Sequence, residues 1–119
     1  MQLFSSLDST TADGVWLTIG SFDGVHKGHQ EIIGRVVAGA HAHAAPAVVL
    51  TFFPHPAIVL RGSNGPFYLT SPDERVTILA NLGVDIVIIQ QFDRQLANTS
   101  ARDFMVQLKE HLGLHKLLV

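Results

Sequence analysis

Two histidines three residues apart are the strongest chemical feature of this sequence. His26 and His29 close the segment GSFDGVHKGH (residues 20–29), in which glycine recurs every four residues. Imidazoles at this spacing project from one side of a helical turn, and an imidazole can donate a hydrogen bond to a phosphate oxygen. The combination predicts stabilisation of negative charge on a phosphate. The spacing alone leaves two alternatives open, a pair of surface histidines and half of a metal site.

The position of this segment supports the phosphate hypothesis. It follows an apolar run over residues 15–20 that reads as a buried strand, and it precedes a helix predicted from about Lys27. In open α/β sheets, ligands bind at the carboxyl ends of the strands, and a helix N-terminus there attracts phosphate. The segment has neither the ending of a P-loop nor the Gly-x-Gly-x-x-Gly fingerprint.

The remaining pattern alternates strands with helices, and this predicts an α/β fold with a doubly wound parallel sheet. Further strands are expected over residues 47–53, 84–92 and 116–119; further helices are expected from the Ser71-Pro72-Asp73-Glu74 capping box to Gly83, and from Ser100 to Gly113.

Residues 1–14 are rich in Ser, Thr and Asp and are predicted to be an irregular segment, and residues 15–119 to be a partial domain. A chain of 119 residues is one domain or part of one. Because the sequence stops inside the apolar run Leu117-Leu118-Val119, we expect the C-terminal part of the domain to be missing.

Composition excludes several classes of function. The chain has no cysteine, which excludes disulfides, thiolate catalysis and zinc–sulfur sites. Its net charge of −2 gives no basic surface for nucleic acid. The first residues lack the basic start of a secretory signal, and no apolar run approaches the ~18 residues of a membrane span. We therefore expect a cytoplasmic protein without nucleic-acid or membrane partners.

Two motifs together resemble a known family. The run Phe22-Asp23-Gly24-Val25-His26, continued by Gly28 and His29, resembles the His-x-Gly-His signature of the nucleotidylyltransferase superfamily. In its fuller form it is similar to the FMN adenylyltransferase module of bacterial bifunctional riboflavin kinase/FAD synthetases. The run TFFPHP (residues 51–56) is similar to that family's Thr-Phe-x-Pro-His-Pro segment. A weaker third match includes Glu74 and Arg75, and the resemblance extends from about residue 16 to residue 119.

The resemblance implies a Rossmann-like nucleotidylyltransferase topology and transfer of an adenylyl group from ATP to FMN, giving FAD and pyrophosphate with the help of Mg²⁺. It implies catalytic roles for His26 and His29. The residues that it places around the nucleotide and the flavin are Gly20, Ser21, Phe22, Asp23, Gly24, Gly28, Pro54, His55 and Pro56. Asp23 either helps to place Mg²⁺ or braces the loop, so the metal ligands stay open. A further C-terminal segment and a riboflavin kinase domain are expected beyond Val119.

Two alternatives remain. The chain is also compatible with a non-catalytic fragment that binds a nucleotide or flavin, and with a nucleotidylyltransferase for another phosphorylated acceptor. The match at Pro54, His55 and Pro56 argues against the second. Asp93 and Arg94, which follow the strand expected over residues 84–92, are interpreted as a surface turn or as a substrate contact.

Overall fold

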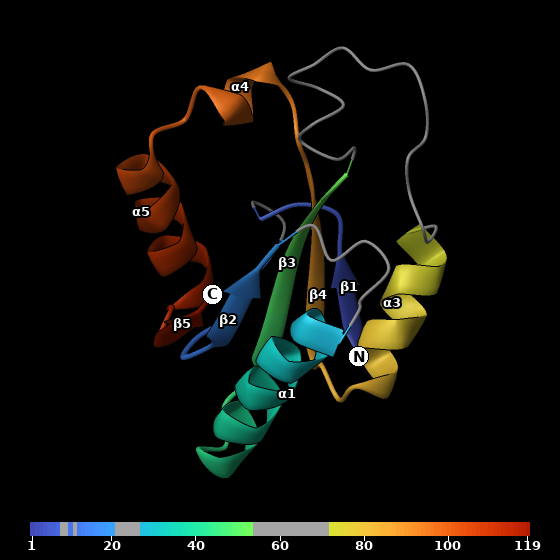
Figure 1. Ribbon diagram of the computed structural model, residues 1–119. Helices are drawn as coiled ribbons and strands as arrows, with labels where there is room; N and C mark the ends of the chain where they lie inside the picture. Colours follow the sequence, from blue (N-terminus) through green and yellow to red (C-terminus); the bar gives the residue numbers. More distant parts are fainter. Residues whose placement is uncertain (8–9, 11, 21–26, 54–71) are drawn as a thin grey trace.

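The computed structural model describes residues 1–7, 10, 12–20, 27–53 and 72–119 (Figure 1). Within these residues, parallel strands form one sheet in the order β1-β4-β3-β2-β5. The strands are β1 (Gln2–Phe4), β2 (Trp16–Ile19), β3 (Ala47–Phe53), β4 (Ile86–Gln91) and β5 (Lys116–Leu118). The helices are α1 (Lys27–Ala42), α3 (Pro72–Asn81), α4 (Arg94–Ala97) and α5 (Ala101–Leu112).

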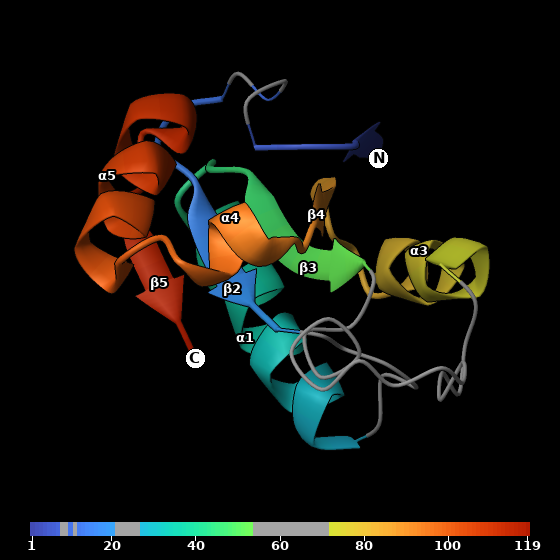
Figure 2. The ribbon, with the colours of Figure 1, turned by 90° about the horizontal axis from the view of Figure 1, so that it is seen from above.

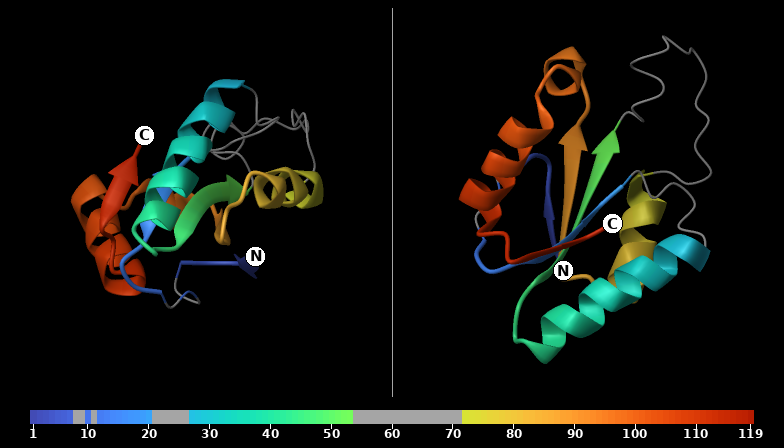
Figure 3. Two further views of the ribbon diagram at one scale, coloured as in Figure 1. Left: turned by 90° about the horizontal axis from the view of Figure 1, so that it is seen from below. Right: turned by 60° about the vertical axis from the view of Figure 1, so that its left-hand side comes forward.

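Helices cover both faces of the sheet. Along β3, Val48 and Leu50 belong to a core cluster that includes Leu108 and Leu112 of α5. The intervening Val49 belongs to a second cluster, which α1 and α3 complete. Figures 2 and 3 accordingly show α1 and α5 on opposite sides of β2, with α3 beside β3. The predicted doubly wound parallel sheet is therefore confirmed.

The N-terminal segment differs from the expectation of an irregular run. β1 pairs in parallel with the edge of β4, with Gln2 opposite Ile86. Beyond the strand, the Leu7 amide donates a 2.7 Å hydrogen bond to the side-chain oxygen of Gln90. Three residues are too few to show a strand periodicity, and the partner that orders them lies far away in the sequence.

The C-terminal cap of α1 is built without glycine. The Ala45 amide donates to the Ala40 carbonyl at 2.8 Å, and the Ala44 amide to the His41 carbonyl at 3.2 Å. This pair of bonds is a Schellman motif, which requires a left-handed residue. Ala44 occupies that place with φ 54°. α5, in contrast, ends at Gly113 with φ 55°, where the sequence predicts a glycine cap.

Gly39 allows α1 to approach the sheet closely. A Cβ atom at Gly39 would overlap the indole ring of Trp16, whereas a Cβ atom at Gly34 would meet nothing within 4 Å. Trp16 is only 8% exposed and packs with Val36 and Ala40 of the same helix. Among the described helices, none is long and apolar enough to cross a membrane.

Candidate functional site

The site expected from the sequence lies where the connections of the sheet change direction. β2 has β3 on one side and β5 on the other. The chain leaves β2 through α1 toward β3, and it reaches β5 through α5 on the opposite face of the sheet. This arrangement is a topological switch point, and ligands of open α/β sheets bind at the carboxyl ends of the strands that flank it.

Three of the predicted site residues are described and lie at this edge. Gly20 directly follows β2, and its amide donates a 3.1 Å hydrogen bond to the Leu50 carbonyl of β3. Gly28 is exposed and His29 half-buried, both in the first turn of α1. The other predicted residues lie outside the described part of the chain: Ser21, Phe22, Asp23, Gly24, His26, Pro54, His55 and Pro56. Their roles stay predictions.

The N-terminus of α1 suits an anion. Its first turn contains no acidic residue, so no carboxylate of that turn neutralises the positive end of the helix dipole. A Cβ atom at Gly28 would meet no atom within 4 Å, so the described surroundings leave this side of the turn open. The backbone amides of a first helical turn, the positive end of the dipole and an imidazole together form an environment that favours phosphate.

An aromatic pocket lies at the same edge of the sheet and was not predicted from the sequence. It is a cavity of about 260 Å³, open to solvent, where β3 and β4 end and α4 and α5 begin. The rings of Phe52 and Phe92 meet edge to face, with centroids 5.6 Å apart and planes at 81°. The pocket is lined by Phe52, Phe92, Leu96, Thr99, Ala101 and Phe104. Its surface suits a planar, largely apolar ring.

A buried pair, Thr51 and Arg75, joins β3 to α3 near this edge. Thr51 is 1% exposed and Arg75 2% exposed. Nη1 of Arg75 donates to Oγ1 of Thr51 over 3.5 Å, at the long end of hydrogen bonding. The sequence contains both residues within family-like segments but gives no sign that they would meet.

Asp93 has a structural role at the start of α4. Its carboxylate accepts a 2.8 Å hydrogen bond from the Leu96 amide and caps the short helix. Arg94, the first residue of that helix, is exposed. The sequence left open whether these two residues form a surface turn or contact the substrate. The geometry favours the surface turn, because the Asp93 carboxylate is already used as the N-cap of α4.

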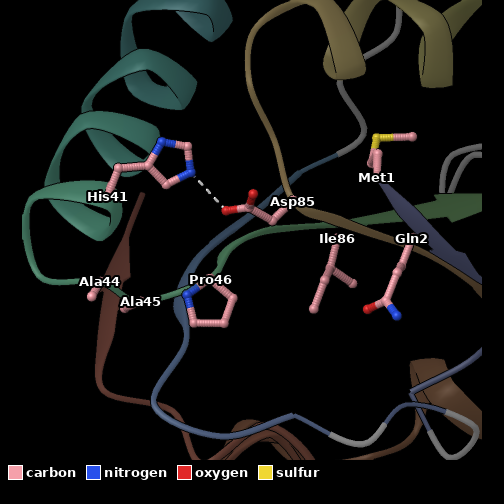
Figure 4. Close-up of a pocket in the computed structure, with 8 residues that line it drawn as sticks. All are labelled: Met1, Gln2, His41, Ala44, Ala45, Pro46, Asp85 and Ile86. Atoms are coloured by element: carbon pink, nitrogen blue, oxygen red, sulfur yellow. Dashed lines mark hydrogen bonds and ion pairs between the residues drawn. The ribbon is translucent and has the colours of Figure 1, made fainter.

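A second pocket, of about 510 Å³, lies at the opposite edge, where the strands begin (Figure 4). His41 at the end of α1 points toward Asp85, and Nε2 lies 2.8 Å from Oδ2. The same carboxylate oxygen accepts the Ala47 amide at 2.8 Å. Asp85 thereby ties the end of α1 to the start of β3. In the described part of the chain, no three His, Asp or Glu residues gather as a metal site would require.

A doubly wound parallel sheet with an anion-attracting helix N-terminus at its switch point defines the class of Rossmann-like α/β proteins, to which nucleotidylyltransferases belong. The family model described as FAD synthetase matches residues 8–119. The chain therefore belongs to the FAD synthetase family.

Curated relatives carry the name bifunctional riboflavin kinase/FMN adenylyltransferase. The Escherichia coli K12 protein is 34% identical over 115 residues, which are 96% of this chain and 37% of the relative. The Haemophilus influenzae protein is 36% identical over 122 residues, with 100% of this chain and 40% of the relative covered. The chain thus spans well under half the length of these relatives.

A solved structure has the same fold. It is titled as a macrolide-efflux protein from Streptococcus pneumoniae, and it superimposes with a TM-score of 0.82 at 26% identity. The match covers 98% of this chain and 39% of the other. The whole described architecture therefore recurs within a longer chain.

Proposed function

We propose that this chain carries out the adenylyl transfer of FAD synthesis. A phosphate oxygen of FMN attacks the α-phosphorus of ATP and forms the new P–O bond. The bond from the α-phosphorus to the bridging oxygen breaks, and pyrophosphate leaves with that electron pair. One observation supports the proposal: Gly28 and His29 lie at the start of α1, which follows β2 at the switch point of the sheet, and open α/β sheets bind ligands at such points.

Each feature of the edge has a part in the reaction. The α1 N-terminus and His29 hold the phosphates of ATP and stabilise the charge that develops on them during transfer. His26, from the same motif, has the corresponding role. Mg²⁺ enters as part of the substrate, bound to ATP. The aromatic pocket that includes Phe52 and Phe92 accepts the flavin ring.

The test is FAD formation by the chain itself. The chain is incubated with FMN, ATP and Mg²⁺, and the flavins are separated by chromatography. We expect His29→Ala to lower the rate by about 10²–10³-fold, the usual cost of removing one donor that stabilises transition-state charge. His43→Ala is the matched control, since this exposed histidine lies just beyond the other end of α1 and stacks on Trp16 at the start of β2. Equal rates for wild type and His29→Ala would remove His29 from the mechanism.

A second candidate function is binding without turnover. The chain spans only 37% and 40% of the first relatives, so residues that complete the substrate sites can belong to the part not present here. Under this alternative, calorimetry detects FMN or ATP binding while chromatography detects no FAD. A preference for CTP over ATP would instead favour transfer to another phosphorylated acceptor.

A further inference from the structure

A buried arginine lies near the ligand edge of the sheet, at the start of a helix. Arg75 is the fourth residue of α3, so its cation is close to the positive end of the helix dipole. It is also 2% exposed, and arginine is rarely buried to this extent unless partners hold it. Proteins keep such locally unfavourable choices mainly at functional sites. Arg75 therefore calls for a functional explanation.

The described contact of Arg75 is with the end of β3. Its Nη1 donates to the hydroxyl of Thr51, which is itself 1% exposed. Thr51 lies on the strand face that α1 and α3 cover, as Val49 does. Because side chains alternate along a strand, Phe52 points to the other face. There it lines the aromatic pocket and meets the Phe92 ring.

We propose that Arg75 is a positioning residue for the flavin substrate: by holding Thr51 it fixes the carboxyl end of β3 and so the place of Phe52 in the aromatic pocket. The proposal rests on the proposed function, because the flavin is the ligand assigned to that pocket. Without the Arg75 contact, the last residues of β3 rotate more freely, and the edge-to-face arrangement of Phe52 and Phe92 loosens.

The proposal predicts an effect on one substrate only. The pocket with Phe52 lies at β3 and β4, whereas Gly28 and His29 lie at the switch point between β2 and β5. Loosening the end of β3 therefore weakens FMN binding and leaves ATP binding unchanged. A general loss of stability would weaken both.

Matched variants test the contact from each of its two partners. Arg75→Met keeps a similar volume, and an apolar residue in place of a buried ionic one is often neutral for folding. Thr51→Val removes the acceptor and keeps the shape, while Thr51→Ser keeps the acceptor. Arg35→Met is the control for loss of an arginine, because Arg35 is exposed and its 2.8 Å pair with Glu31 is a surface salt bridge of little worth.

Two measurements test the proposal on the 119-residue chain. Titration calorimetry gives the Kd for FMN and for ATP. We expect Arg75→Met and Thr51→Val to raise the FMN Kd about tenfold, with the ATP Kd unchanged, and Thr51→Ser and Arg35→Met to match wild type. Amide hydrogen exchange follows β3 without any ligand: exchange at Phe52 and Phe53 should quicken in Arg75→Met, while Val48 stays protected.

The outcomes separate this inference from the proposed function. Unchanged exchange at the end of β3 overturns the role of Arg75 whether or not FMN binds. Faster exchange in Arg75→Met with an unchanged FMN Kd would mean that Arg75 has only a structural role, and this result also overturns the proposal. A wild-type chain that binds no FMN overturns the proposed function and the substrate named here, whereas equal FMN affinity in wild type and Arg75→Met overturns the inference alone.

Discussion

At the scale of single residues, two glycines of α1 lie in different surroundings, and only one of the two positions requires glycine. Gly34 is exposed, and a Cβ atom there would meet nothing within 4 Å. Its effect on stability therefore comes only from the low helix propensity of glycine. Gly39 lies against the ring of Trp16, where any Cβ atom would overlap the indole. The same residue type therefore weakens the helix at one position and makes its packing possible at the other.

This contrast gives a stability prediction. Gly34→Ala should raise the free energy of unfolding by up to ~1 kcal/mol, because alanine is the better helix former. Gly39→Ala should lower it by about 1–3 kcal/mol, the usual cost of overpacking a core. Urea denaturation of both variants measures the two effects. Stabilisation by Gly39→Ala would show that Trp16 moves aside at little cost.

At the scale of elements, the end of α1 offers a second stability prediction. Ala44 has φ 54° in the Schellman motif, a conformation that costs an L-residue roughly 1–2 kcal/mol. Ala44→Gly should therefore stabilise the protein by about 1 kcal/mol, since glycine adopts this conformation freely.

Ala38→Gly is the matched control for that prediction. Ala38 is exposed within α1, where glycine costs about 0.8–1.0 kcal/mol, so this variant should be less stable. Thermal unfolding of the two variants should shift in opposite directions. Shifts of the same sign would mean that glycine acts here through the unfolded chain rather than through the cap.

Elements with local signals were predictable from the sequence. β3 occupies residues 47–53 as expected, and α1 begins at Lys27 where the helix was predicted. Ser100 caps α5 by accepting the Asp103 amide at 3.1 Å, and Gly113 ends it. Such signals act over a few residues, so the sequence shows them directly. The short helix α4 was not predicted, because its four residues are too few to show an apolar periodicity.

Features that depend on distant pairing were not predictable. The parallel register places Phe52 opposite Gln90, and this brings the Phe52 ring to Phe92. No residue close to Phe52 in the sequence indicates how β3 aligns with β4. The buried contact between Arg75 and Thr51 depends on the same tertiary arrangement. The sequence motifs thus predicted a phosphate side of the candidate site, whereas the aromatic pocket and the contact between Arg75 and Thr51 became visible only in the folded sheet.

At the scale of the whole molecule, a nucleotide that binds the α1 N-terminus should stabilise the fold. A ligand that binds only the native state at 100 times its Kd adds about 2.7 kcal/mol. For a domain of this size that corresponds to a rise in Tm on the order of 10 °C. We expect ATP with Mg²⁺ to give this shift in calorimetry, and AMP a much smaller one, because AMP lacks the β- and γ-phosphates. Equal shifts for AMP and ATP would argue against a phosphate site at α1.

The pairing of β1 with β4 also has a consequence for synthesis on the ribosome. Gln2 lies opposite Ile86, so β1 cannot pair until the ribosome has added 84 further residues. At ~5–20 residues per second, that wait is roughly 4–17 s. β2 and β3 pair with each other and are both made before β4, so this part of the sheet can assemble while β1 stays unpaired. β1 is thus among the last of the described strands to join the native sheet, although it precedes them in the sequence.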